Sequence, residues 1–234
     1  MLMRIRQCCE IALAFAALAF SAEQVWDRAP ASWTKAEAQS ILDNSPWSQS
    51  INAAIIPVQS EEARRAGGVM GQEHGLGYDL QSSKSAGLLG SWRSSPQLQT
   101  VPLLIRWESA LPVRVAELRS GQTGVPLDAF DGCILAIYRI PGTYFGDPGK
   151  WSKQLVSSAS LESGGHPLTR PEQATVYQMS DGVAAVYYFP STAVEDAKAS
   201  IYFQARIGRL QISKAFLPEK MRFQGALALA TSSK

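Results

Sequence analysis

The sequence predicts an α+β fold in which short helices pack on a mainly antiparallel β-sheet, with a β-rich C-terminal half. From residue 173 on, apolar and polar residues alternate with the two-residue period of strands, and turn signals separate the segments. Before that point, capping residues precede segments with apolar residues at helical spacing. At 234 residues and 46% hydrophobic, the chain is long and apolar enough to bury a core.

The first 22 residues have the pattern of a secretory signal peptide. Arg4 and Arg6 precede a run of ten apolar residues over 11–20, and residues 19–21 fit the small-residue cleavage pattern. A membrane-spanning helix needs about 20 residues, so the run is short for one. We expect export to the periplasm or beyond, with cleavage at 21 or 22 and membrane contact only before it. An uncleaved anchor is the alternative.

Charge and cysteine content exclude several classes of protein. The 22 basic and 20 acidic residues give a net charge of +2, which offers no basic surface for nucleic acid. Three cysteines do not make a disulfide framework, and Cys8 and Cys9 lie in the predicted leader. Cys133, in the apolar string CILAIY, is predicted to be a small buried side chain.

The N-terminal part, residues 23–59, is predicted to hold one helix and one strand. Thr34 and Glu37 have the spacing of a capping box, which opens a helix within 33–44, and Pro46 ends it. Residues 51–58, INAAIIPV, are typical of a strand. Residues 60–97 are rich in Gly and Ser without any period, which indicates a flexible insertion. The remainder of a single α+β domain is expected over 98–234.

The segment after the insertion predicts a strand followed by a helix. Residues 101–108 place Val101, Leu103, Ile105 and Trp107 on one face of a strand. We expect Ser109 to cap a helix that runs to about Arg119, with Arg114 and Glu117 facing outward. Its predicted apolar stripe consists of Leu111, Val115 and Leu118.

The C-terminal half predicts one buried strand, a helix, two hairpins and a last strand. Residues 133–140 are apolar on both faces, which indicates a central strand. Asp147-Pro148 is a cap pair that opens a helix containing Trp151 and Leu155. Hairpins are expected over 174–189 and 200–216, with one sheet face buried and the other meeting water or a partner. A single last strand is expected to bury Met221, Phe223, Leu227 and Leu229 on one face.

Three passages of the sequence together resemble a family of uncharacterised exported bacterial proteins. They are DNSPWSQSI at 43–51, IRWESALPVR at 105–114 and AFLPEKMRFQGALAL at 215–229, arranged around a Gly-rich insert. The resemblance implies an exported α+β protein and carries over no catalytic residue. This sequence departs from it in having Ser and Gln within the insert.

The motifs of common enzymes are absent or incomplete. Ser32 and Lys35 match S-x-x-K, and Ser180-Asp181-Gly182 faintly matches a second penicilloyl-serine motif, but there is no K-T-G and a helix cap and a turn explain both serines. His74 with Glu73 and Asp79 lacks the spacing of a zinc site, so a solvated loop is favoured. Asp128 and Asp131 are explained by turn chemistry, and His166 lies in a predicted turn. No metal or other cofactor is expected.

These patterns favour an exported, non-catalytic binding or interaction protein of the cell envelope, with an envelope protein as its expected partner. We expect the insertion to carry contact residues, because loops on a rigid scaffold carry recognition. The candidates are His74, Tyr78 and Trp92. Two alternatives stay open: an envelope hydrolase of glycan or peptide, whose carboxylates need not be adjacent in sequence, and a structural component that oligomerises through sheet edges. The sequence does not set the oligomeric state.

Overall fold

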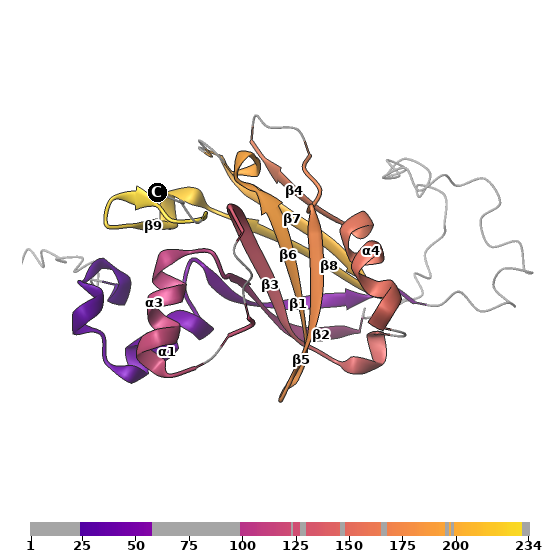
Figure 1. Cartoon of the computed structure of the whole chain (residues 1–234), viewed down its shortest axis with the longest axis horizontal. Helices are drawn as coiled ribbons and strands as arrows, with labels where there is room; N and C mark the ends of the chain where they lie inside the picture. The colour runs from indigo at the N-terminus through magenta and orange to yellow at the C-terminus, as the bar shows by residue number, and fades with distance from the viewer. Residues whose placement is uncertain are drawn as a thin grey trace, which may run out of the picture.

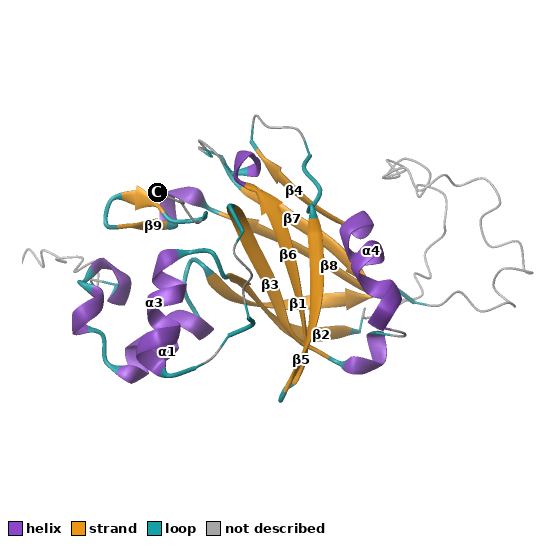
Figure 2. Cartoon of the chain, viewed as in Figure 1, coloured by secondary structure: helices purple, strands orange, loops and turns teal. Residues whose placement is uncertain are grey.

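An eight-stranded antiparallel sheet organises the described part of the chain, in the order β4-β7-β8-β1-β2-β3-β6-β5 (Figures 1 and 2). The structure is a computed structural model that describes residues 24–57, 99–122, 124–126, 130–145, 148–164, 168–194, 197 and 199–230. The sheet strands are β1 (Ser48–Ile55), β2 (Thr100–Trp107), β3 (Gly132–Ile140), β4 (Ala159–Ser163), β5 (Gln173–Met179), β6 (Gly182–Pro190), β7 (Ile201–Ile207) and β8 (Leu210–Phe216). The predicted α+β fold is confirmed.

Helices lie at two places around this sheet. The α-helices are α1 (Lys35–Asp43), α3 (Leu111–Ser120) and α4 (Pro148–Ser158). Short 3₁₀ turns are η1 (Val25–Asp27), η2 (Pro30–Ser32), η4 (Gly142–Tyr144), η5 (Ser191–Ala193) and η6 (Pro218–Lys220). Helices α1 and α3 pack on each other, whereas α4 contacts β5 and β7 and so lies across the curl of the sheet (Figure 1). No helix among the described residues is long and apolar enough to cross a membrane.

The first helix forms as its capping box predicts. Thr34 Oγ1 accepts a hydrogen bond from the Glu37 amide at 3.2 Å, and the Thr34 amide donates to Glu37 Oε2 at 2.8 Å. The following strand begins at Ser48, earlier than the predicted start at 51. Because β1 pairs with both β2 and β8, the segment that precedes the insertion lies inside the sheet. The predicted insertion itself falls outside the described residues.

Burial differs between the strands. In β7 and β8, buried and exposed residues alternate as predicted, whereas β3 and β6 are buried on both faces almost throughout. The expectation that one sheet face is buried and the other meets water or a partner is therefore wrong for β6, which is buried on both faces. Strand β2 is likewise buried on both faces from Leu103 onward. The reason is a second apolar cluster on the outer face of the sheet, which Val125 and Phe130 cover from the segment after α3.

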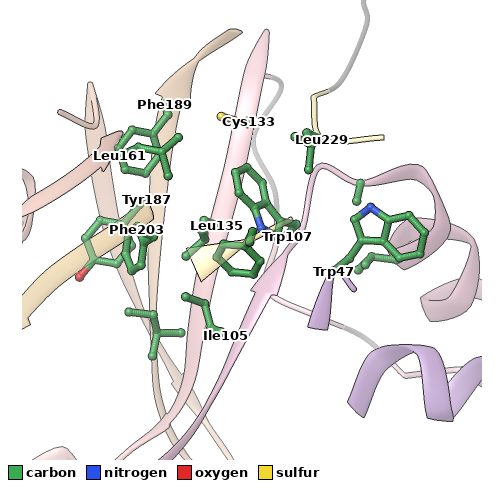
Figure 3. Packing of buried hydrophobic residues seen from close by; sticks show 14 of the residues in the cluster. Trp47, Ile105, Trp107, Cys133, Leu135, Leu161, Tyr187, Phe189, Phe203 and Leu229 are labelled. Carbon is green, nitrogen blue, oxygen red and sulfur yellow. The ribbon is translucent and has the colours of Figure 1, made fainter. Parts of the chain in front are cut away.

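The main core fills the inner side of the curled sheet. Trp107 packs edge-on against Phe216 with ring centroids 5.4 Å apart, and Tyr187 packs against Phe203 at 5.5 Å. Figure 3 shows Trp107 beside Leu135 in this core. Cys133 is fully buried here as predicted, and burial raises the pKa of its thiol to about 12.

The C-terminal segment folds as a hairpin, so the prediction of one continuous last strand is wrong. Strands β9 (Arg222–Phe223) and β10 (Ala226–Leu227) pair with each other and form a separate two-stranded sheet. Gln224 and Gly225 both have positive φ, at 50° and 83°, which reverses the chain between them. Glycine adopts this conformation freely, but glutamine gives little warning of it in a sequence.

Two side chains fasten this C-terminal segment to the sheet. Trp47 Nε1 donates to the Ala228 carbonyl oxygen at 2.8 Å, and Ser109 Oγ donates to that of Leu229. Ser109 Oγ also accepts from the Ile134 amide at 2.9 Å. Ser109 was expected to cap α3, but the N-cap residue is Ala110, and the Ser109 hydroxyl serves β3 and the C-terminal segment. Figure 3 shows Trp47 near Leu229.

Ser109→Ala should lower the free energy of unfolding by about 2–3 kcal/mol, because it leaves a buried amide and a buried carbonyl without their partner. Urea unfolding of the protein measures this. Ser157→Ala is the matched control, since Ser157 is exposed and bonds only within its own helix. That control should change the stability by no more than about 0.5 kcal/mol. Equal effects of the two substitutions would contradict the role of Ser109.

Candidate functional site

A buried group of charged side chains lies on the outer face of the sheet. Arg106 of β2 is 5% exposed and Glu108, just after the strand, is fully buried. Arg106 Nε lies 2.6 Å from Glu108 Oε1, and Arg106 Nη2 lies 3.0 Å from Glu117 Oε1 of α3. A guanidinium removed from water needs such partners, because its desolvation costs several kcal/mol. Burial by itself lowers the pKa of Arg106, but the charge of Glu108, with Tyr138 and Glu117, outweighs it and raises that pKa above its ordinary value, so the guanidinium stays charged.

Tyr138 of β3 completes this group, which we call the Arg106 cluster (Arg106, Glu108, Glu117 and Tyr138). The Tyr138 hydroxyl accepts from Arg106 Nη2 at 2.7 Å and donates to Glu108 Oε1 at 2.6 Å. The Arg106 guanidinium carbon also lies 4.5 Å from the centre of the Tyr138 ring. Burial, followed by the charge of Glu108, raises the pKa of Tyr138 well above its ordinary value, so the phenol stays protonated and acts as a donor.

Glu117 is the member of the cluster that titrates near neutrality. Burial first, and then the charge of Glu108 nearby, raise the pKa of Glu117 from 4.5 to about 7, against the opposing effect of Arg106 and Arg114. A hydrogen bond between the Glu117 and Glu108 carboxyl groups acts in the same direction. Because two carboxylates in contact repel each other, the pair favours holding one proton.

One buried acceptor in the cluster lacks a partner until that proton is present. Glu108 Oε2 is buried and accepts no hydrogen bond from the described residues. The protonated Glu117 carboxyl, within hydrogen-bonding reach of Glu108, can donate to it. In that state one guanidinium balances one carboxylate, and the buried cluster is electrically neutral.

The backbone after α3 passes directly against the cluster at Gly124. A Cβ atom built on Gly124 would lie 1.9 Å from Glu117 Oε1 and 2.9 Å from Arg106 Nη2. The Val125 amide approaches the Tyr138 hydroxyl at 3.4 Å. The absence of a side chain at residue 124 is therefore what lets this segment pass directly above the ion pair.

Helix α3 is turned opposite to the predicted orientation. Its buried positions are Pro112, Val113, Ala116 and Ser120, with Glu117 on the same side, half-buried against Arg106. Two residues of the predicted core stripe face outward, since Leu111 is 54% exposed and Leu118 is 84% exposed, whereas the third, Val115, is half-buried and packs against the main core. Positions 113, 116, 117 and 120 have the same helical spacing as 111, 114, 115 and 118, so apolar periodicity fits either face. Only the face that is buried brings Glu117 to Arg106, with which it forms an ion pair.

A cavity of about 420 Å³ opens between the second half of α3 and residues 121, 122, 124 and 125. Glu117, 15% exposed as a side chain, forms part of its wall, together with Arg114 and Leu118 of α3 and Val125 of the following segment. Leu118 and Val125 make part of the wall apolar. Through this cavity the Glu117 carboxyl is reached from solvent, next to the exposed Leu118 of α3.

A larger groove of about 1160 Å³ lies beside α1, η1 and the start of β1. Amide and hydroxyl side chains such as Gln39 and Gln49 line it, with Trp26, Asp43 and Lys220. Trp26 is half-buried and packs edge-on against Trp47 at 6.0 Å. This groove holds neither a buried ion pair nor a group with a raised pKa in the described residues, so we give the Arg106 cluster priority.

The predicted site residues have different outcomes. His74, Tyr78 and Trp92 fall outside the described residues, as do Glu73, Asp79, Asp128 and His166, so predictions about them stay predictions. Ser32 donates to the Ala29 carbonyl oxygen, and both Ser32 and Lys35 are exposed. Ser180 and Asp181 form the turn between β5 and β6, and Asp131 is exposed before β3. No group of three or more His, Cys, Asp and Glu residues that could hold a metal ion occurs within the described ranges.

Sequence reasoning missed the Arg106 cluster. In the passage IRWE, charged and apolar residues alternate, and this pattern is typical of a strand with one solvent-exposed face. Charged residues in a strand or a helix usually lie on the exposed face, so nothing in the sequence indicated that these would be buried. Their burial becomes evident only when β2, β3 and α3 are placed together. Comparison of the chain with models of protein families, with curated proteins and with solved structures finds no match.

Glu117→Gln should remove a pH dependence of stability. In the folded protein the pKa of Glu117 is raised from 4.5 to about 7. The folded state therefore binds the proton more tightly than the unfolded state, and the free energy of unfolding falls as pH rises from about 4.5 to 7. We expect a loss of about 1–3 kcal/mol over this range for the native chain, and a smaller loss for the amide variant.

Urea unfolding at several pH values measures this difference. Glu172→Gln is the control, because Glu172 is exposed and lies just before β5. Its pH profile should follow that of the native chain. A Glu117→Gln variant that loses stability with pH as steeply as the native chain would contradict the raised pKa.

Proposed function

We propose that the protein is an exported, non-catalytic interaction protein of the cell envelope that binds a partner protein through the outer face of α3. Export rests on the signal-peptide pattern of residues 1–22. The observation that supports binding at α3 is the exposure of Leu111 and Leu118 on its outer face, whereas Val115, the third residue of the stripe, is half-buried and packs against the main core. Exposed apolar residues at helical spacing, rimmed by polar groups, are typical of interaction surfaces.

The orientation of α3 makes this stripe difficult to bury within the chain itself. Turning the helix over would take Val113 and Ala116 out of the core and leave the Arg106 guanidinium without Glu117. Breaking a buried ion pair by removing one partner costs about 3–5 kcal/mol. The cost of exposing two leucines is therefore offset by the burial of the opposite face, and a partner that covers the leucines gains their burial energy.

The neighbouring cavity extends this surface. A helix of ten residues spans about 15 Å, which is short for an interface on its own. Leu118 belongs both to the stripe and to the cavity wall, so stripe and cavity form one continuous face. A partner can lay an apolar surface on the stripe and insert a side chain into the cavity, as buried anchor residues do at protein interfaces.

Site-specific photo-crosslinking in cells tests this proposal. A crosslinking residue is placed at Leu111 or Leu118, and at Leu217 as the control, which is 40% exposed on another segment. We expect one common protein product at both α3 positions and none at Leu217. A crosslinker at Trp92 tests the predicted role of the insertion in parallel, and the mass of the mature chain reports cleavage of the leader. The same products at all positions, or none on α3, would contradict the α3 surface.

One observation supports the hydrolase alternative. A carboxyl group with a pKa near 7 on a cavity wall suits general acid–base catalysis. Against it, the Glu117 carboxyl is in hydrogen-bonding contact with Glu108, whereas the paired carboxylates of glycosidases stand about 5 Å or more apart. Hydrolysis of envelope glycan or peptide by the native chain that Glu117→Gln abolishes would favour this alternative; no hydrolysis by either would remove it.

A further inference from the structure

The Arg106 cluster is short of one positive charge. Arg106 faces two carboxylates, Glu108 and Glu117, and Tyr138 is neutral. The oxygen Glu108 Oε2 is buried without a donor. A proton shared between the carboxyl groups supplies the missing charge at acidic pH. A cation that entered the cavity would supply it in place of the proton.

The cavity selects the type of cation. It combines a carboxylate, Glu117, with the apolar side chains Leu118 and Val125. A bare metal ion would leave that apolar wall unused, and the described residues offer no group of metal ligands. A lysine or arginine side chain has an alkyl stem that fits an apolar wall and a charged end that pairs with a carboxylate.

The charged groups that face Glu117 are few. From the sheet side these are Arg106 and Glu108, with Tyr138 behind them, and from its own helix it is Arg114. Arg114 is exposed on the cavity wall and forms no ion pair within 4 Å in the part of the chain that the structure describes. The described residues of the covering segment, 121, 122 and 124–126, carry no titratable side chain. On the cavity side the carboxylate therefore has one neighbouring cation, Arg114, whose charge lowers the pKa of Glu117 but which forms no ion pair with it.

We propose that this cavity is a binding subsite for a basic side chain of the partner protein, which pairs with Glu117 as the Glu117 carboxyl releases its proton. The proposal rests on the proposed interaction function and names the chemistry of the anchor: an alkylammonium or alkylguanidinium group. The charges balance, because one organic cation enters the cluster as one proton leaves it. Binding is accordingly weaker at acidic pH, where the proton competes.

NMR titration of the Glu117 carboxyl carbon in the mature chain tests the subsite without knowledge of the partner. The probe is n-butylammonium chloride, compared with n-butanol and with sodium chloride at equal ionic strength. A cation that binds the ionised carboxyl must lower its pKa by linkage. We expect n-butylammonium to lower the pKa of Glu117 by about one unit, which corresponds to about tenfold tighter binding to the ionised form. Neither control should do so.

Two variants sharpen the result. Arg114→Gln removes the one basic side chain on the cavity wall, so n-butylammonium should lower the Glu117 pKa at least as much as in the native chain. Arg119→Gln, on the same helix but outside the cavity lining, should leave the response unchanged. No shift beyond that of sodium chloride, or an equal shift at the exposed Glu172, would overturn the subsite. A clear shift together with no crosslinking at Leu111 and Leu118 would keep the subsite and remove the proposed function.

Discussion

The buried guanidinium of Arg106 is the constraint on which the outer side of this fold depends. A permanent positive charge inside a protein must be paired, and the pairing here draws in residues from three elements: Glu108 after β2, Glu117 of α3 and Tyr138 of β3. Meeting this requirement sets which face of α3 packs inward. It also brings the chain after α3, at Gly124, directly over the ion pair, from where that chain continues to cover the outer apolar cluster.

A second set of contacts joins segments that are remote in sequence. The Trp107 amide donates to the Trp47 carbonyl oxygen, the Trp47 indole donates to Ala228, and Ser109 donates to Leu229. The passages 43–51, 105–114 and 215–229 thus meet in one place. Each passage by itself gives no sign of this meeting, because these three hydrogen bonds join residues that are far apart in the sequence. The two strands of the C-terminal hairpin are only two residues each, so these hydrogen bonds and the burial of Met221, Phe223 and Leu229 in the main core hold it in place.

Elements with local causes were predictable, and elements with distant causes were not. The capping box of α1 and the turns of the two large hairpins act within a few residues, so the sequence carried their signals. The orientation of α3 had no local signal, because two opposite faces satisfy the same spacing and the deciding partner, Arg106, lies on another element. Ser109 was misassigned for the same reason: its hydrogen-bond partners are at 134 and 229. The Arg106 cluster was not predicted, because charged residues that alternate with apolar ones in a strand usually face water.

The interaction that orients α3 also determines how binding there would affect the rest of the molecule. Leu111 and Leu118 are exposed because the opposite face of α3, with Glu117, packs inward. When Glu117 ionises, the cluster holds two carboxylates and a single guanidinium, so one negative charge has no positive charge to balance it. A basic anchor in the cavity would therefore change the charge of the same cluster that holds the helix. Without such an anchor, ionisation above pH 7 weakens the cluster through repulsion between Glu108 and Glu117. With the anchor in place that repulsion is offset, so a bound partner should stabilise the fold most under neutral to alkaline conditions, where the proton has left.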